Sequence, residues 1–309
     1  MADAELPNPT SAPFFIWLLS LFNYVGHNTF ISSYMHVLFQ TFSILLIFFQ
    51  ALILNQIIIK HKFFHGSSYL PAFFYVILMS LFAEFVTLNE VLIANTFLLF
   101  ALEKLFVISK KERPLVQIFD TGILLSIASL FYLPSIFFFL HFFVIIALLR
   151  TFVWREWIIG LSGIIIPHFL VGTYFFLTDQ LPLFIEYHIT DQIRLSTFEL
   201  RYNAIMLASA GLVLLLVLLA SFMVQASFLR SVVQIRNYFV IVFWSLIISI
   251  LSILIQPDYK MTHYILLAIP VSILLGYYFG ELRSHLLAEI LATSLLLLVF
   301  ANHYLHLII

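Results

Sequence analysis

Residues 178–203 (TDQLPLFIEYHITDQIRLSTFELRYN) concentrate side chains that could do acid–base or phosphate-binding chemistry. The charged and titratable members are four acids, two arginines and a histidine: Asp179, Glu186, Asp191, Glu199, Arg194, Arg201 and His188. Carboxylates can act as general bases, and arginines bind phosphates through paired N–H donors. This segment is the long polar interruption in an otherwise apolar chain, so we expect it to take part in any polar chemistry.

Shorter polar segments hold further candidates of the same kinds. They are Asp3 and Glu5 near the start, Glu84 and Glu90 around EFVTLNE, and Lys260 and His263 after an aspartate. Gathered in one place, such groups could bind a metal and a phosphate, or set a general base beside a cationic clamp. For any single residue, the simpler interpretation is an ordinary charge in a solvated loop.

The composition excludes a soluble protein. Of 309 residues, 63% are hydrophobic and 9% charged, and 36 are Phe, which indicates a multi-pass membrane protein. The apolar runs are uniform and about twenty residues long, as membrane-crossing helices require, and they lack the alternation of a porin-type barrel. The sequence therefore predicts an all-α polytopic fold. A net charge of -1 gives no nucleic-acid footprint, and zero Cys excludes disulfides and thiol catalysis.

The pattern predicts about ten transmembrane helices in one integral-membrane domain covering residues 1–309. The candidate spans are 32–59, 69–88, 91–108, 117–133, 135–149, 157–177, 203–229, 238–255, 263–280 and 286–307. Residues 14–25 are apolar but too short to span, which predicts an interfacial helix within an external N-terminal segment, 1–31. Leu133-Pro134 is either a tight turn between two spans or a kink, and the alternation of charged loops favours the turn.

The cations divide unevenly between alternate connections. One set holds ten, namely Lys60, Lys62, Lys110, Lys111, Arg113, Arg150, Arg155, Arg230, Arg236 and Arg283. The other set holds Arg194, Arg201 and Lys260. Because cytoplasmic loops carry the excess of Lys and Arg, we place the richer set in the cytoplasm and the 178–202 loop outside. An external N-terminus without a preceding helix is less usual, which leaves open a further span upstream.

Charges inside the predicted spans are confined to helix ends, whereas the midplanes carry amides such as Gln50, Asn95 and Gln225. Intramembrane charges usually mark ion or proton pathways. Their absence disfavours an ion-coupled transporter. The histidine pairs His303/His306 and His61/His65 have zinc-like spacing, but no third ligand lies nearby in the sequence, so we predict no metal site from them.

Five long stretches resemble an uncharacterised family of bacterial multi-pass inner-membrane proteins, known as a domain of unknown function. They are QALILNQIIIKHKFF (50–64), SSYLPAFFYVILMSLFAEF (67–85), ANTFLLFALEKLF (94–106), GILLSIASLFYLPSI (122–136) and LLRTFVWREWIIGLSGIIIPHFLVGTYFFLTD (148–179). This resemblance covers nearly the whole chain. It implies the bacterial inner membrane as the location and brings no activity with it.

The order of parts is also similar to the C-type glycosyltransferase superfamily, whose members take a sugar from a polyprenyl-phosphate carrier at the outer membrane face. Asp3-Ala4-Glu5 before the interfacial helix resembles its acidic motif, and the acidic segment 84–90 its second external loop. Residues 122–130 resemble its G-x-x-x-G-L-A-x-L segment, with Ser126 replacing the second glycine. HYILLAIPVSILLG (263–276) resembles its R-Y-x-L-x-x-x-P helix, with His263 where arginine is frequent.

This second resemblance implies an enzyme that uses polyprenyl-phosphate-linked sugars. Asp3 or Glu5 would be the catalytic base or hold a divalent cation. The substrate-binding groups would be Arg194, Arg201, Lys260 and His263 on the leaving phosphate, with Glu84 and Glu90 beside them. Two alternatives remain: a non-enzymatic scaffold or subunit of an envelope-assembly or secretion complex, which binds membrane protein partners, and a carrier or flippase for a lipid-linked substrate. In each case the lipid bilayer is a partner.

Overall fold

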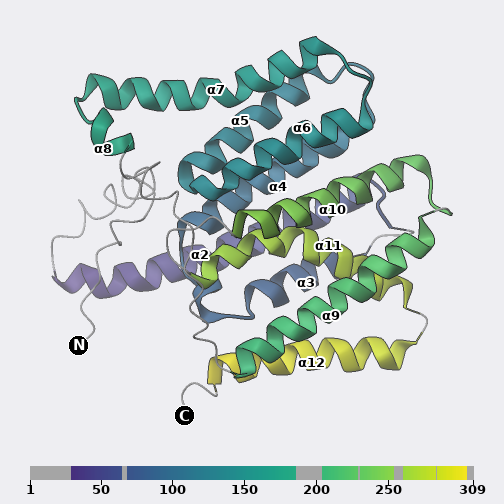
Figure 1. Cartoon of the computed structure of the whole chain (residues 1–309). Helices are drawn as coiled ribbons and strands as arrows, with labels where there is room; N and C mark the ends of the chain where they lie inside the picture. The colour runs from purple at the N-terminus through teal and green to yellow at the C-terminus, as the bar shows by residue number, and fades with distance from the viewer. Residues whose placement is uncertain are drawn as a thin grey trace. The chain divides into compact units, whose positions relative to one another are not determined.

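A computed structural model describes residues 29–64, 68–185, 204–228, 230–253, 260–282 and 284–304 (Figure 1). The described residues form helices and turns, with no strand among them, which confirms the all-α prediction. The α-helices are α2 (Thr29–Lys60), α3 (Leu70–Met79), α4 (Glu90–Ile108), α5 (Leu115–Phe131), α6 (Phe137–Leu149), α7 (Trp154–Leu177), α8 (Leu181–Ile185), α9 (Ala204–Ser227), α10 (Val233–Ile253), α11 (Ile265–Glu281) and α12 (His285–Tyr304). Three 3-10 turns are η1 (Ala83–Val86), η2 (Leu133–Ile136) and η4 (Met261–Tyr264).

Seven of the described helices are long and apolar enough to cross a membrane. They are α2, α4, α7, α9, α10, α11 together with η4, and α12. The other three predicted spans coincide with shorter apolar helices: α3, α5 and the continuous η2–α6 segment. The count of ten crossings therefore stays a prediction. The proposed interfacial helix at 14–25 lies outside the described residues.

The Leu133-Pro134 segment forms a turn between two helices. Helix α5 ends because Tyr132 adopts an extended conformation (φ -146°, ψ 102°). The carbonyl of Tyr132 then accepts hydrogen bonds from the backbone N–H of Ser135 at 3.0 Å and from its hydroxyl at 2.8 Å. These bonds close the η2 turn, and α6 runs back alongside α5 (Figure 1). The structure thus has the turn and not the kink.

The contacts divide the chain into two units, each built from three chain segments. Unit 1 contains α4 to α8, the beginning of α2, the end of α10 and residues up to His263. Unit 2 contains most of α2 and α10 together with α3, η1, α9, α11 and α12.

In unit 1, α5 and α7 approach each other through glycines. A Cβ placed on Gly163 would lie 2.5 Å from the carbonyl oxygen of Phe119, and one on Gly122 would lie 2.7 Å from that of Gly160. Both distances are too short for a real side chain, so the two backbones are in direct contact at these positions. Helix α4 packs on the same α5 and is joined to it by the Lys104–Asp120 ion pair at 2.8 Å.

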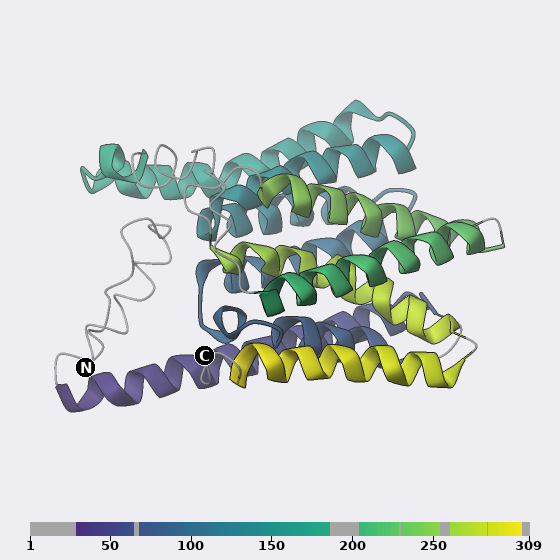
Figure 2. The same ribbon diagram turned by 60° about the horizontal axis from the view of Figure 1, so that its bottom comes forward.

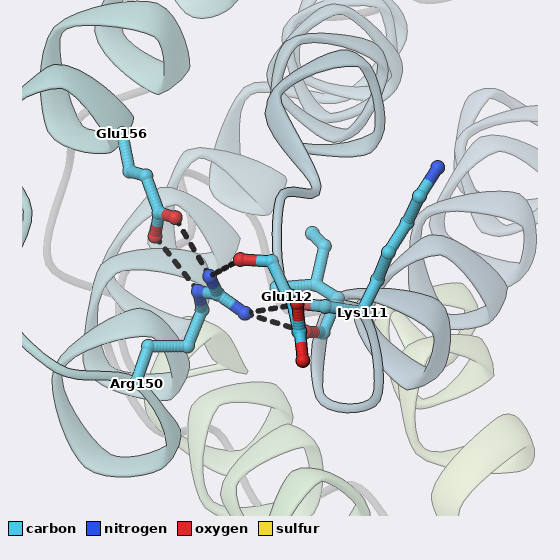
Figure 3. A network of polar contacts seen from close by, with 5 residues as sticks. Lys111, Glu112, Arg150 and Glu156 are labelled. Atoms are coloured by element: carbon cyan, nitrogen blue, oxygen red, sulfur yellow. Dashed lines mark hydrogen bonds and ion pairs between the residues drawn. The ribbon is translucent and has the colours of Figure 1, made fainter.

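Arg150, directly after α6, joins several segments at the end of unit 1 where α4 ends and α7 begins (Figure 3). Its Nε and Nη2 donate to the two carboxylate oxygens of Glu156 in the first turn of α7, at 2.8 and 2.7 Å. Nη1 donates to the carbonyls of Ile108 and Lys111 at 3.2 and 2.7 Å, and Nη2 also donates to that of Glu112 at 2.8 Å. The guanidinium has five N–H donors, and these contacts use all of them. They join the end of α4, the following loop and the start of α7.

Unit 2 is organised around α3 and α11. Gly276 of α11 faces Pro71 of α3 so closely that a Cβ would lie 2.8 Å from the proline ring. Helices α9 and α12 pack together (Figure 2), and Asn302 donates a hydrogen bond to the hydroxyl of Ser209 at 2.8 Å between them. Contacts through small residues and single hydrogen bonds of this kind are common between membrane-spanning helices.

Two long helices end in a left-handed cap. After α2, Lys62 has φ 50°, and the N–H of Phe63 bonds the carbonyl of Ile58 at 3.1 Å. After α7, Asp179 has φ 56°, and the N–H of Gln180 bonds the carbonyl of Phe175 at 2.9 Å. This is the Schellman arrangement, which satisfies the last carbonyls of a helix. It explains why α7 stops where residues 178–203 begin.

Replacing Arg150 by lysine should destabilise unit 1. Lysine keeps the positive charge but cannot reproduce the planar fork, so the buried Glu156 carboxylate and the three carbonyls lose donors. We expect Arg150→Lys to lower the free energy of unfolding by about 3 kcal/mol. Thermal denaturation in detergent, followed by circular dichroism, measures the change. The control is Arg155→Lys, an identical exchange at an exposed position, and equal melting temperatures for both variants would contradict the clamp.

The glycine contact predicts opposite effects at two positions of α7. Gly163→Ala forces α5 and α7 apart because its Cβ meets a backbone oxygen, and we expect a loss of about 2 kcal/mol. Gly172→Ala meets nothing within 4 Å and should be neutral or slightly stabilising, since alanine favours helix. The two melting temperatures measured in parallel test this, and a stable Gly163→Ala protein would show that the helices are not in backbone contact.

Candidate functional site

Tyr132 and His263, which are 131 residues apart in the chain, meet in unit 1. The Tyr132 hydroxyl and Nδ1 of His263 share a short hydrogen bond, and the ring centroids lie 5.4 Å apart. Both side chains are buried, with exposures of 3% and 4%. His263 lies in η4, and its backbone N–H bonds the carbonyl of Lys260 at 3.3 Å.

The turn that positions Tyr132 is fixed by its own sequence. Tyr132 caps the end of α5, and Ser135, with its side chain buried, bonds back to the Tyr132 carbonyl. The next helix, α6, starts immediately after η2, which contains Pro134. Tyr132 is therefore held between two helix ends, outside the helices themselves, and its hydroxyl has a defined direction toward η4.

The Tyr132 hydroxyl is buried, and the Glu90 carboxylate is near enough to interact with it electrostatically. A tyrosine hydroxyl carries its proton at physiological pH. It can donate to an unprotonated Nδ1 of His263 or accept from a protonated one. Phenol and imidazole groups can each donate and accept hydrogen bonds, as groups in acid–base chemistry do.

Glu90 begins α4 at this same end of unit 1. The preceding Asn89 caps the helix, because its side-chain oxygen accepts from the N–H of Leu92 at 2.8 Å. Asn89 is 8% exposed, whereas Glu90 and Lys260 are half-buried. Three of the candidates predicted from the sequence, Glu90, Lys260 and His263, thus belong to one unit. His263 bonds Tyr132, and Glu90 is near enough to interact with Tyr132 electrostatically.

Of the remaining predicted site residues, the structure describes Glu84. Glu84 is exposed in η1, where its carbonyl accepts from the Thr87 hydroxyl at 2.7 Å, and it belongs to unit 2. Asp3, Glu5, Arg194 and Arg201 lie outside the described residues. Their roles stay predictions.

A histidine within α7 was missed by the sequence analysis. His168 bonds two hydroxyls of α5: its Nδ1 lies 2.7 Å from the oxygen of Ser126, and its Nε2 lies 3.1 Å from that of Ser129. The Ser126 hydroxyl also donates to the carbonyl of Ile164 at 2.8 Å. A histidine in the middle of an apolar run was the available signal, since polar groups inside such runs need partners. The serine partners on another helix could not be read from local sequence.

Two further polar contacts lie inside unit 2. The Tyr75 hydroxyl donates to the side-chain oxygen of Gln50, and both residues are completely buried. His61 bonds the Tyr238 hydroxyl at 3.2 Å, and Gln234 donates to the same hydroxyl at 2.6 Å. In both contacts, polar groups satisfy one another within the protein. Across the described residues, no group of three or more His, Cys, Asp or Glu could hold a metal ion.

Comparison of the chain with protein families, curated proteins and solved structures finds no match.

Proposed function

We propose that this chain is a multi-pass protein of the bacterial inner membrane, with its cation-rich loops in the cytoplasm. The grouping of those loops within each unit supports their placement on one side of the membrane, and their excess of Lys and Arg indicates the cytoplasmic side. In unit 1, Arg150 bonds the carbonyls of Lys111 and Glu112, so two predicted cytoplasmic loops lie together. In unit 2, His61 bonds Tyr238, which brings the end of α2 to the start of α10, as alternating crossings require.

We further propose that the opposite end of unit 1 binds a polyprenyl-phosphate-linked sugar for transfer at the outer face. The observation that carries this proposal is the convergence of Glu90, Tyr132 and His263 from three distant segments. A buried tyrosine–histidine pair beside a carboxylate supplies hydrogen-bond donors and a proton-accepting group at one place. Lys260, three residues before His263, adds a positive charge next to it.

In this proposal, Asp3 or Glu5 removes the proton from an acceptor hydroxyl, whose oxygen then attacks the anomeric carbon of the sugar. The new glycosidic bond forms as the bond between that carbon and the phosphate oxygen breaks. The lipid phosphate leaves with the bonding electrons, and Lys260, Arg194 and Arg201 neutralise its charge. A divalent cation on the acidic residues would assist the same departure.

A second candidate, a non-enzymatic scaffold or subunit of an envelope-assembly complex, is favoured by a different observation. His168, His61 and Gln50 bond to other residues of their own unit and serve to hold helices together. Such internally satisfied groups are structural. The same observation makes a carrier or flippase the weakest of the three candidates, because a transport path needs polar groups directed to a substrate.

The orientation can be tested directly because the chain contains no cysteine, so every introduced cysteine is a unique label. Intact cells expressing Thr87→Cys should react with a membrane-impermeant maleimide, since Thr87 is exposed and lies in a predicted external loop. Glu112→Cys, exposed in a predicted cytoplasmic loop, should react only after permeabilisation. The reverse pattern would invert the orientation and remove the basis for an external site.

The transfer reaction is tested with membranes that contain the full chain and a polyprenyl-phosphate-linked sugar donor. Lys260→Gln should reduce the rate of glycan transfer by roughly 30- to 1000-fold, which corresponds to the loss of one transition-state contact of about 2 to 4 kcal/mol. Asp3→Asn combined with Glu5→Gln should abolish it. The matched control is Lys62→Gln, which loses the same charge at the opposite face.

Unchanged transfer in the Asp3/Glu5 double variant would remove these residues as catalysts. Absence of transfer by the wild-type chain, with the membrane orientation confirmed, would favour the scaffold.

A further inference from the structure

The Arg150 contacts assemble two loops into one surface at the cation-rich end of unit 1 (Figure 3). One loop follows α4 and is anchored by the buried Pro114, and the other leads from α6 into α7. Arg150 and Glu156 neutralise each other in this arrangement at 2.7 Å. The clamp therefore fixes the backbone of both loops and leaves their remaining charges to define the surface.

Those remaining charges are mainly positive. The exposed cations are Lys110, Lys111 and Arg113 in the first loop and Arg155 in the second, and the exposed acid between them is Glu112. Lys111 also contacts the Gln117 amide at 3.4 Å. The other charged pair nearby, Lys104 with Asp120, is already matched between α4 and α5. The exposed cations Lys111, Arg113 and Arg155 outnumber the exposed acid Glu112, so this surface carries a net positive charge.

Large apolar side chains are exposed immediately beside these cations. Phe152 is 78% exposed, Val153 41% and Trp154 70%. The exposed stripe continues along one face of α7 at helical spacing through Ile158 and Leu161, which are 46% and 50% exposed. A cationic surface thus passes without interruption into an apolar stripe along a candidate membrane span.

We propose that this surface, formed by Lys111, Arg113, Phe152, Trp154 and Arg155, binds the headgroup of an anionic phospholipid in the cytoplasmic leaflet. The cations take the phosphate, the aromatic rings lie at headgroup depth, and an acyl chain follows the α7 stripe. The inference uses the membrane insertion and orientation proposed above but is independent of any sugar transfer.

The combination of features selects a lipid over other anions. The cations could bind a free phosphate or a nucleic acid. Neither ligand would cover the three consecutive exposed apolar residues beside the cations. An acidic protein segment would leave the α7 stripe uncovered. A phospholipid carries its charge and its apolar chain in the same relative positions as the surface does.

The test uses the full chain reconstituted in phosphatidylcholine nanodiscs with a small fraction of spin-labelled phosphatidylglycerol. The immobilised fraction of the label reports lipid held by the protein. The triple variant Lys111→Gln, Arg113→Gln, Arg155→Gln should weaken retention at least tenfold, since each cation near a charged headgroup contributes about a fivefold effect. Trp154→Ala should weaken it without a change in charge.

The matched control is Lys60→Gln, Lys62→Gln, Arg230→Gln, which removes three cations from predicted cytoplasmic loops of unit 2. Equal losses in both triple variants, or full retention in the first, would overturn the proposal. Displacement of the lipid by millimolar inorganic phosphate would also overturn it, because the site would then recognise phosphate alone. Resistance of the wild-type chain to carbonate extraction is measured separately: failure there refutes the membrane insertion, and loss of lipid selectivity in an inserted chain refutes only this site.

Discussion

The Arg150–Glu156 contact determines how unit 1 is arranged. Both side chains are largely buried, with exposures of 13% and 5%, and an ion pair in such surroundings is costly unless every donor and acceptor is satisfied. The guanidinium meets that condition by reaching three backbone carbonyls as well as the carboxylate. Because these carbonyls belong to the end of α4 and its following loop, the pair sets where α4 stops and where α7 starts. It also links two loops that the sequence separates by about forty residues.

The Arg150–Glu156 pair fixes the start of α7, and the glycine contact between α7 and α5 depends on that register. Gly160 and Gly163 lie one and two turns after Glu156. Gly163 and the carbonyl of Gly160 meet α5 at backbone distance, whereas a Cβ on Gly160 would meet the Phe142 ring of α6. A contact of that kind tolerates little sliding, since a shift of one residue would bring a side chain into the partner backbone. The charged anchor at the helix end and the small residues farther along therefore act together. Neither would be recognised as important from its own local sequence.

Element positions were predictable where apolar runs were long. The span predicted at 91–108 corresponds to α4 (Glu90–Ile108), and that at 157–177 to α7 (Trp154–Leu177). The span predicted at 69–88 instead ends early, because α3 covers only Leu70–Met79 and is followed by the η1 turn. Phe82, directly before η1, and Phe85 within it are buried, and their ring centroids lie 5.2 Å apart. Buried apolar composition is the same in a helix and in a packed turn, so hydropathy could not distinguish them.

The candidate site was predictable only in part, because some of its residues have a local sequence signal and others do not. Glu90, Lys260 and His263 were identifiable as polar residues at the ends of apolar runs, whereas Tyr132 needed the long-range contact with His263. Ser126 shows how a local pattern can mislead. It stands where the resembling glycosyltransferase segment has a second glycine, which looks like a lost close contact. In the structure the close approach is kept by Gly122, and the Ser126 hydroxyl adds hydrogen bonds to α7 through Ile164 and His168.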